Sequence, residues 1–367
     1  MTNGTDGQRI VIIGGGPGGL TCARILQQHG IDATVYERDA DEHARDQGGT
    51  LDLHEHDGQV ALRAAGLLDE FFARARLDAQ EMRRVSTSGE LVQRFVPDAG
   101  DTSAPEIDRG QLRSMLLRSL RPGSVQWGKA VESVTGPDAG PRTVVFRDGT
   151  SVQADLVIGA DGAWSRVRAA VSDARPAYSG VGFVEAWFDD VDVAHPELAR
   201  LVGGGSAMIS DTDGAFFAQR NSGDHMRVYL VRRRPLDWMT RAGLAPEDTE
   251  GIRAHLLQEF AGWSPEVLRF VTDNDGAYLD RPLFALPSPH TWEQSASVTL
   301  LGDAAHLMPP AGVGVNLAML DASELALALV HAGSTAEAVR AYEATMLPRS
   351  AERQAALDGK ADFLLHA

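Results

Sequence analysis

A glycine cluster lies between an apolar run and an amphipathic segment near the start of the chain. The run 9–13 is rich in β-branched residues, the cluster is Gly14 to Gly19, and segment 18–30 carries apolar residues at helical spacing. Such glycines let backbone amides approach a pyrophosphate at a helix N-terminus, and a carboxylate after the next strand can bind ribose hydroxyls. The pattern predicts a dinucleotide site built from Gly14, Gly16, Pro17, Gly18, Gly19 and Glu37. A ligand-free glycine turn is the alternative, and the cluster alone does not separate FAD from NAD.

Two further polar motifs each follow an apolar run. The first contains Asp161, Gly162, Ser165 and Arg168 in D-G-x-x-S-x-x-R spacing, and the second is the G-D-A-A-H-x-x-P block at 302–309. Together with the glycine cluster, they resemble the class A FAD-dependent aromatic hydroxylases typified by para-hydroxybenzoate hydroxylase. The resemblance implies that the first motif takes part in FAD and pyridine nucleotide binding. It also implies that the aspartate of the second motif holds the ribityl chain.

Segments 48–54, 106–113 and 302–310 are most similar to those of the tetracycline-inactivating flavin monooxygenases. This similarity implies that Glu37 and Arg38 contact the adenosine and that Arg109 contacts the ribityl region. Besides the glycine cluster and Glu37, the cofactor-binding residues that it implies are Arg38, Asp52, Arg109, Asp161, Asp303, Pro310, Gly314, Val315 and Asn316.

The loop from Gly312 runs into an apolar helical pattern that starts near Gly314. A helix start of this kind directs unpaired backbone amides and the positive end of the helix dipole toward the pyrimidine edge of a flavin. We therefore expect Gly312, Gly314 and Asn316 to flank the isoalloxazine ring. No catalytic residue is assigned, because the flavin carries the chemistry. His306 is interpreted as structural, since the sequence shows no partner acid.

The resemblance also implies a reaction. NADPH binds transiently, reduces the FAD and leaves, and the reduced flavin and O2 form a C4a-hydroperoxide that transfers OH to an electron-rich carbon. A permanent NAD domain is not expected, because the glycine run 203–205 lacks the flanking strand and helix. The alternatives on the same scaffold are a flavin-dependent reductase or a halogenase. A halogenase is disfavoured because none of the six tryptophans lies in a W-x-W-x-I-P segment. A non-catalytic flavin-binding or ligand-binding protein is the other alternative.

Segment 176–284 has alternating apolar runs that are typical of an antiparallel sheet. In the resembled family such a sheet forms the substrate wall. There Glu185 stands where the tetracycline enzymes have a glutamine and Arg227 where they have a histidine, and Phe217 and Pro310 complete the substrate candidates. The expected substrate is a phenolic or enolic, aromatic or polycyclic small molecule, with tetracyclines among the candidates. Arg227 also fits a solvated face, and Phe217 also fits a core position.

The elements that position these residues predict an α/β fold. We predict a Rossmann-like FAD-binding domain of the GR2, para-hydroxybenzoate hydroxylase type, with an inserted, mostly antiparallel β-sheet substrate domain and a C-terminal helix. The FAD-binding domain comprises 1–80, 100–175 and 285–340, the substrate domain 81–99 and 176–284, and the C-terminal helix 341–367. Further expectations are helices at 108–120 with Asp108 as N-cap, 314–332 and 335–356, and a strand meander at 124–127, 143–146 and 151–153.

The bulk properties exclude several classes of partner. A net charge of −17 repels nucleic acid and acidic membrane surfaces. The leader 1–9 has no apolar region typical of a signal peptide, and no His, Cys, Asp and Glu spacing fits a metal. We expect a cytoplasmic monomer that uses FAD, NADPH, O2 and an aromatic small molecule and binds neither metal, membrane nor nucleic acid. The single cysteine, Cys22, is expected to be a buried small hydrophobe.

Overall fold

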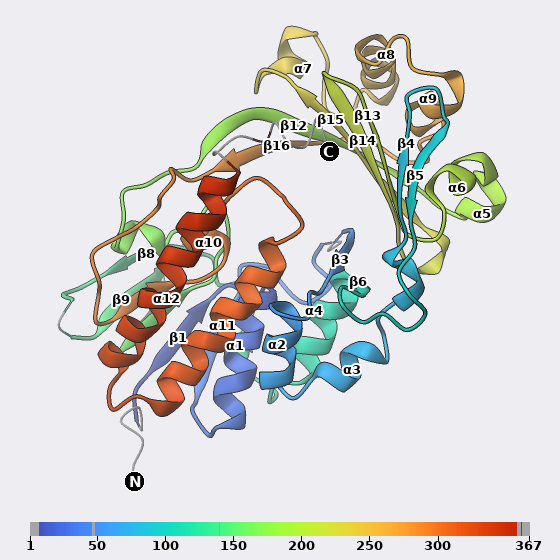
Figure 1. Cartoon of the computed structure of the whole chain (residues 1–367). Coiled ribbons are helices and arrows are strands. Elements are labelled where there is room, and N and C mark those ends of the chain that lie inside the picture. The colour runs from blue at the N-terminus through green and yellow to red at the C-terminus, as the bar shows by residue number, and fades with distance from the viewer. Residues whose placement is uncertain (1–6, 46–47, 139, 358–360, 362–367) are drawn as a thin grey trace.

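The computed structural model of the chain describes residues 7–45, 48–138, 140–357 and 361. It shows two main layers, one built on a parallel sheet and the other on a large, mostly antiparallel sheet that arches over it (Figure 1). The predicted α/β fold is confirmed.

A parallel sheet forms the base of the first layer. Its strand order is β17 (Val298–Leu300), β11 (Leu156–Gly159), β1 (Ile10–Ile13), β2 (Ala33–Tyr36) and β7 (Val125–Gln126). Every neighbouring pair in it is parallel. The central strands are apolar along their whole length, as expected for parallel strands that are buried on both faces.

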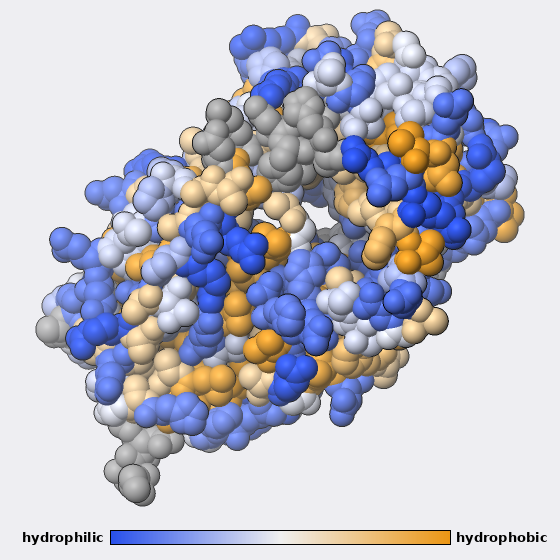
Figure 2. All heavy atoms as spheres, in the orientation of Figure 1, coloured by the Kyte–Doolittle hydropathy of each residue, from blue (hydrophilic) through white to orange (hydrophobic). Residues whose placement is uncertain are grey.

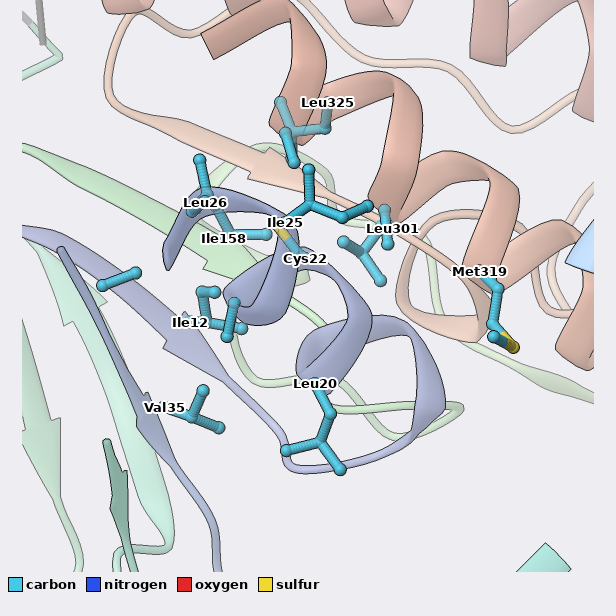
Figure 3. Close-up of a cluster of buried hydrophobic side chains, with 14 of the residues drawn as sticks. Ile12, Leu20, Cys22, Ile25, Leu26, Val35, Ile158, Leu301, Met319 and Leu325 are labelled. Carbon is cyan, nitrogen blue, oxygen red and sulfur yellow. The ribbon is translucent and has the colours of Figure 1, made fainter. Parts of the chain in front are cut away.

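Helices α1 (Pro17–Gln28) and α11 (Gly314–His331) pack against each other over this sheet. Ile12 and Ile158 of the sheet, Leu20 and Ile25 of α1 and Leu325 of α11 belong to the same buried cluster (Figure 3). Cys22 is buried in it as expected, and burial raises the pKa of its thiol to about 12. By length and composition, α11 is the one helix in the described part of the chain that could cross a membrane. It packs against α1, α2 and α12 and is half buried, as a core helix is.

The second layer is a seven-stranded sheet that brings together segments distant in the sequence. Its order is β16 (Leu279–Ala285), β12 (Ala177–Phe188), β15 (Met226–Arg233), β14 (Gly214–Arg220), β13 (Ser206–Ser210), β4 (Met82–Val85) and β5 (Leu91–Phe95). All neighbouring pairs are antiparallel except β13 and β4. One face buries apolar residues against helices α6 (Pro196–Val202), α8 (Thr249–Glu259) and α9 (Pro265–Thr272). We propose that this sheet is the core of the substrate domain, with the boundaries 81–99 and 176–284.

The predicted meander differs from the observed one. β9 (Arg142–Phe146) and β10 (Ser151–Ala154) do pair, but their third strand is β8 (Val131–Thr135). Segment 124–127 contributes β7 to the parallel sheet instead, because the backbone of β2 is free to pair on that side and Val35 donates to the Ser124 carbonyl at 2.9 Å. Proximity along the chain therefore predicted the wrong partner for this segment.

The remaining strands and helices complete the two layers. β3 (Thr50–Asp52) and β6 (Glu106–Asp108) form a two-stranded antiparallel ribbon. The last helix, α12, begins at Thr335 and ends at Ala356, which confirms the helical pattern predicted for 335–356. The part of the proposed C-terminal helix at 358–360 and 362–367 lies outside the described residues. The other helices are α2 (Gly58–Ala64), α3 (Leu68–Phe72), η1 (Leu77–Gln80), α4 (Arg109–Arg118), η2 (Arg168–Ala170), α5 (Val191–Ala194), η3 (Ser222–Asp224), α7 (Trp238–Arg241) and α10 (Asp303–His306).

Asp108 precedes α4 but does not cap it with its side chain. Its carboxylate instead accepts hydrogen bonds from Ser222 and from Arg76, the latter at 3.2 Å. Asp108 therefore occupies the predicted N-cap position, but the side-chain capping hydrogen bond is absent because Arg76 and Ser222 bind the same carboxylate.

Candidate active site

The glycine cluster connects β1 to α1 and contains two kinds of glycine. A Cβ at Gly14, whose φ is +111°, would lie 2.2 Å from the Ala160 carbonyl oxygen, and one at Gly19 would lie 2.1 Å from the Gly14 carbonyl oxygen. These two are required by packing of the chain itself. Gly16 is the N-cap of α1, and no atom lies within 4 Å of a Cβ built on it. The space beside Gly16, at a helix start with unpaired amides, fits a pyrophosphate.

Glu37 lies beside this cluster, at the end of β2. It is buried, and its carboxylate accepts hydrogen bonds from the backbone amides of Gly15 at 2.6 Å and Asp39 at 3.0 Å. Arg38, next to it, is exposed. The structure therefore brings the predicted acid to the glycine turn, and shows that this acid also orders the turn.

Arg113 is a site residue that the sequence analysis did not single out. It is buried, and it donates to the carbonyl oxygens of Gly15 and Glu42, both at 3.1 Å. Its guanidinium also lies 5.3 Å from the centre of the Trp127 ring. The sequence signal for this residue was its place directly beside the apolar stripe of α4, which indicates burial. A buried cation needs polar partners, so such an arginine is expected to bind neighbouring carbonyl or carboxylate oxygens.

The two later motifs meet in space. Arg168 donates to the carbonyl oxygens of Ala304 at 2.8 Å and Asp303 at 3.0 Å, so the end of the first motif holds the first turn of α10. Asp161 accepts from the Ser165 hydroxyl at 2.5 Å and from the Arg166 amide at 2.7 Å. Burial raises the pKa of Asp161. Asp161 thus closes its own turn, whereas the side chain of Asp303 is exposed at the start of α10.

His306 has a partner acid that the sequence did not reveal. Its Nε2 lies 2.6 Å from Oδ2 of Asp321, and both side chains are buried. Asp321 also accepts from the Gly302 amide at 3.0 Å and from Arg349 at 2.7 Å. An aspartate inside the apolar helix α11 was the signal for this cluster. The cluster fixes the turn that presents Asp303.

The loop before α11 is held by Asn316. The side chain of Asn316 is buried, accepts from the His54 amide at 2.8 Å and donates to the Asp52 carbonyl at 2.8 Å. It therefore joins the helix start to β3 and is not itself free to contact a ligand. The backbone amides of Gly314, Val315 and Asn316 lie in the first turn, where a helix provides no acceptor.

The residues at this helix start fit the edge of a flavin. No atom lies within 4 Å of a Cβ built on Gly314, and Gly312 has a φ of +75° that turns the loop into the helix. Pro310 is exposed on the same loop. With the open space at Gly16 and the carboxylates of Glu37 and Asp303, the arrangement provides room and donors at both ends of an FAD molecule.

The substrate candidates Glu185, Phe217 and Arg227 lie on one face of the large sheet. The register places Glu185 opposite Tyr229, and Tyr229 opposite Phe217. Glu185 accepts from Arg227 and, at 3.1 Å, from Arg281. Both members of the Glu185 and Arg227 pair are buried. Pro310, the fourth candidate, comes from the loop before α11 instead.

Aromatic rings surround this ion pair. Phe217 is stacked with Tyr229 at 6.4 Å between ring centres, Phe183 lies 5.4 Å from Tyr229, and Arg227 lies 4.7 Å from the centre of the Trp187 ring. Tyr229 was not among the predicted site residues, although its alternation with Arg227 in β15 indicates the same face. Burial raises the pKa of Tyr229, and the nearby Glu185 raises it further.

This face meets the FAD-side layer at the segment before β3. A Cβ at Gly48 would lie 2.5 Å from Nη1 of Arg227, and one at Gly49 would lie 2.8 Å from Oη of Tyr229. The Arg109 amide donates to the Gly49 carbonyl at 3.0 Å, which places Arg109 at the same junction. Figure 2 shows a hollow between the two layers. The predicted flavin loop and the aromatic face thus belong to the two layers that border it.

Comparisons with known proteins agree with this geometry. The model of the FAD binding domain family matches residues 8–267 and 290–355. The monooxygenase penA of Penicillium thymicola is 33% identical over 365 residues, which cover 87% of this chain and 84% of penA.

Two solved structures share the fold. The crystal structure of Klebsiella pneumoniae HpxO with FAD and uric acid superimposes with a TM-score of 0.81 at 25% identity, covering 98% of this chain and 89% of that one. The tetracycline destructase Tet(51) superimposes with a TM-score of 0.69 at 20% identity, covering 95% of this chain and 88% of that one.

Proposed function

The chain belongs to the FAD binding domain family of class A flavin monooxygenases, and from this membership we propose that it hydroxylates a phenolic or enolic ring compound with NADPH as electron donor. The coarser statement, an FAD-dependent monooxygenase acting on aromatic or polycyclic molecules, follows from the family itself. The observation that carries the finer proposal is the aromatic face around the Glu185 and Arg227 ion pair. We further propose that the enzyme is a cytoplasmic monomer that uses O2.

Each part of the site has a proposed place along FAD. The open helix start at Gly16, with Glu37 beside it, would hold the pyrophosphate and adenosine, and Arg38 would reach the adenine. Asp303 and Arg109 would hold the ribityl chain, while the loop from Gly312 to Asn316 would hold the ring. When bound and reduced, FAD supplies the redox chemistry that activates O2.

The residues around the ring have two tasks. The amides at the start of α11 provide donors and a positive dipole end where negative charge develops, and Asn316 holds them in place before the reaction begins. The buried clusters on either side reduce the access of water. Neither task requires a side chain that exchanges a proton with the substrate.

On the opposite wall, Phe217 and Tyr229 offer ring faces to a planar substrate. The Glu185 carboxylate can accept a hydrogen bond from an O–H or N–H group of the substrate, and Arg227 and Arg281 offset its charge. Such a wall favours a flat molecule with a polar edge. The uric acid bound by HpxO and the tetracyclines named for Tet(51) both carry enolic or enolisable groups on fused rings, so we propose fused-ring enols as the first substrates to examine.

The proposal is tested with purified, FAD-loaded protein. NADPH oxidation and O2 uptake are measured with uric acid, a tetracycline and a series of hydroxybenzoates, and products are analysed by mass spectrometry. We expect one class to stimulate both rates equally and to gain one oxygen atom. Substrate-dependent NADPH oxidation that persists without O2 would show a reductase, and bound FAD without stimulation by any compound would favour a binding protein.

A further inference from the structure

The ribbon formed by β3 and β6 carries three carboxylates on one face. Its register places Asp52 opposite Glu106 and Thr50 opposite Asp108, so these four side chains share a face. The other face carries Leu51 and Ile107, which are buried in the main core. A cluster of like charges on so short a ribbon requires that each carboxylate be stabilised or protonated.

The three carboxylates have different partners. Asp108 accepts from Arg76 and Ser222, and Asp52 lies 3.0 Å from Nε2 of His54. Glu106 accepts from the Thr50 hydroxyl at 2.5 Å. Arg76 donates to the Thr50 oxygen at 2.9 Å, and Glu106 is a nearer acceptor for the Thr50 hydroxyl than the Ile107 carbonyl at 3.3 Å.

Glu106 is only 8% exposed. Its pKa is raised to about 7, chiefly by burial and to a smaller extent by Asp52 and Asp108, against the opposing effects of the Thr50 hydrogen bond and Arg76. Glu106 therefore changes charge near neutral pH.

A cavity of about 150 Å³ opens beside this pair. Glu106 and Asp52 form its wall on the ribbon side, and Gln80, Asp101 and Ser103 supply further polar groups. Apolar residues of the large sheet and its flanks close the other side: Met82, Phe95, Pro97, Ala79 and Ala104. A polar cavity of this size can hold water that exchanges protons with Glu106.

Asp52 also touches the proposed flavin loop. Its carbonyl accepts from Asn316, and a Cβ at Gly312 would lie 4.0 Å from its Oδ2. Negative charge that develops at this loop therefore acts on Asp52, which lines the cavity, and on Glu106, which is buried on the opposite strand of the ribbon.

We propose that Glu106, with Asp52 between it and the flavin loop, takes up a proton from water in this cavity when the cofactor is reduced and returns it on reoxidation. The inference rests on the proposed position of the flavin at Gly312 to Asn316. An O–H bond of a hydrated proton breaks and one forms on the Glu106 carboxylate. The electrons come from NADPH, and none passes through Glu106. Glu106 only gains or loses a proton and so offsets part of the negative charge of the reduced cofactor.

The size of the effect has an upper bound. With a pKa of about 7, Glu106 is half protonated at pH 7, so it can gain at most about half a proton per flavin there. The charged groups that face it from neighbouring elements are Asp52, Arg76, Asp101 and Asp108, with His54 behind Asp52. Among these, His54 also has a raised pKa, owing chiefly to its hydrogen bond with Asp52, so the experiment must separate it from Glu106.

Proton uptake is measured with an indicator dye during anaerobic reduction of the FAD-loaded enzyme by NADPH between pH 6 and 8. We expect Glu106→Gln, which keeps the acceptor for Thr50, to take up less than the wild type by up to about half a proton near pH 7. Glu343→Gln is the matched control, because Glu343 is a buried carboxylate of raised pKa that accepts from Thr299 and Trp292, away from the cavity. Glu343→Gln should take up as many protons per flavin as the wild type.

Equal uptake in wild type and Glu106→Gln would overturn the proposal and point to His54. If Glu343→Gln lost as much proton uptake as Glu106→Gln, the proposal would be overturned as well, because the effect would then not depend on a carboxylate beside the cavity. If Glu106→Gln fails to fold, Thr50→Val gives the test without altering His54, because loss of its hydrogen bond to Glu106 should shift the uptake maximum to higher pH. No substrate is present, so a wrong substrate class leaves the result intact, whereas a wild type that binds no FAD would refute both proposals.

Discussion

Arg168 donates to the Asp303 carbonyl at 3.0 Å and so ties the two later sequence motifs into one unit. A second hydrogen bond, to the Ala304 carbonyl at 2.8 Å, fixes the orientation of the guanidinium. The aspartate proposed to hold the ribityl chain therefore depends on a residue far away in the sequence.

Arg168→Lys should weaken FAD binding. Lysine keeps the charge but cannot reproduce the forked geometry, so the turn that carries Asp303 loses its clamp. Hydrogen bonds from charged groups contribute about 1.5–3 kcal/mol, which corresponds to a roughly 10- to 100-fold rise in the dissociation constant for FAD. The dissociation constant for FAD is measured by titration of flavin fluorescence. Arg166→Ala, an exposed arginine of the same loop, is the control and should bind FAD as the wild type does.

Substitutions at two positions of the glycine cluster should have different effects, one on folding and the other on FAD binding. Gly14→Ala should unfold the parallel-sheet layer, because its Cβ would collide with the Ala160 backbone and the residue would keep a left-handed φ. Gly16→Ala meets no atom of the protein and should fold normally while losing FAD affinity, since the methyl enters the space proposed for the pyrophosphate. Thermal unfolding of FAD-free protein and FAD titration distinguish them. Wild-type affinity in Gly16→Ala would place the cofactor elsewhere.

Gly314→Asp should lower FAD affinity or the rate of reduction by NADPH by about tenfold or more. The new carboxylate would stand in open space at the start of α11, where it competes with the flavin for the unpaired amides. Gly314→Ala adds a side chain without charge and should have a much smaller effect. Stopped-flow reduction and FAD titration of both variants provide the measurement, and unchanged values in Gly314→Asp would contradict the placement of the ring.

Neighbouring phenylalanines of β14 should behave differently. Phe216 is fully buried against α8 and α9, so Phe216→Ala should reduce the free energy of unfolding by about 3–5 kcal/mol. Phe217 is on the other face, stacked with Tyr229, so Phe217→Ala should raise KM for an aromatic substrate while leaving FAD binding unchanged. Steady-state kinetics and urea unfolding separate the two. A stability loss without a KM change in Phe217→Ala would make it a core residue.

The glycine turn before α1 and the two helices near the end of the chain were predictable because their signals are local. The turn that begins at Gly14 needs glycine wherever it occurs, and the helical patterns at 314–332 and 335–356 reflect a continuous apolar stripe. Both follow from short-range sterics and periodicity.

What the sequence did not show depends on long-range pairing. Asp321 lies in an apolar helix, and the sequence does not show its partner. The fold shows it, because α10 brings His306 within hydrogen-bond distance of Asp321. In the same way, segment 124–127 pairs with β2 because the parallel sheet has a free edge there, a fact that no local pattern contains. The ion pair of Glu185 with Arg227 joins two strands whose register is set by the whole sheet.

The pair formed by His306 and Asp321 predicts a pH dependence of stability. Burial disfavours the charged imidazole, but Asp321 outweighs it and raises the pKa of His306 above its ordinary value of 6.5. A raised folded-state pKa contributes stability that is fully present below pH 6.5 and is lost as the pH rises through the folded value. The pKa of Asp321 is lowered by His306 and Arg349, so its contribution is lost only on acidification below its ordinary value of 3.8.

The FAD-loaded wild type should therefore have a larger free energy of unfolding at pH 6 than at pH 9, and His306→Gln should remove most of this difference. Asp321→Asn should be worse, costing about 3–5 kcal/mol, because it leaves the buried imidazolium of His306 without its counter-charge and removes one of the two carboxylates paired with Arg349. Urea unfolding at both pH values measures each. His43→Gln, at a histidine whose side chain is 85% exposed, should keep the wild-type difference. If His306→Gln kept this difference too, His306 would be neutral in the folded protein, and the charge of Asp321 would be stabilised by Arg349 and the Gly302 amide.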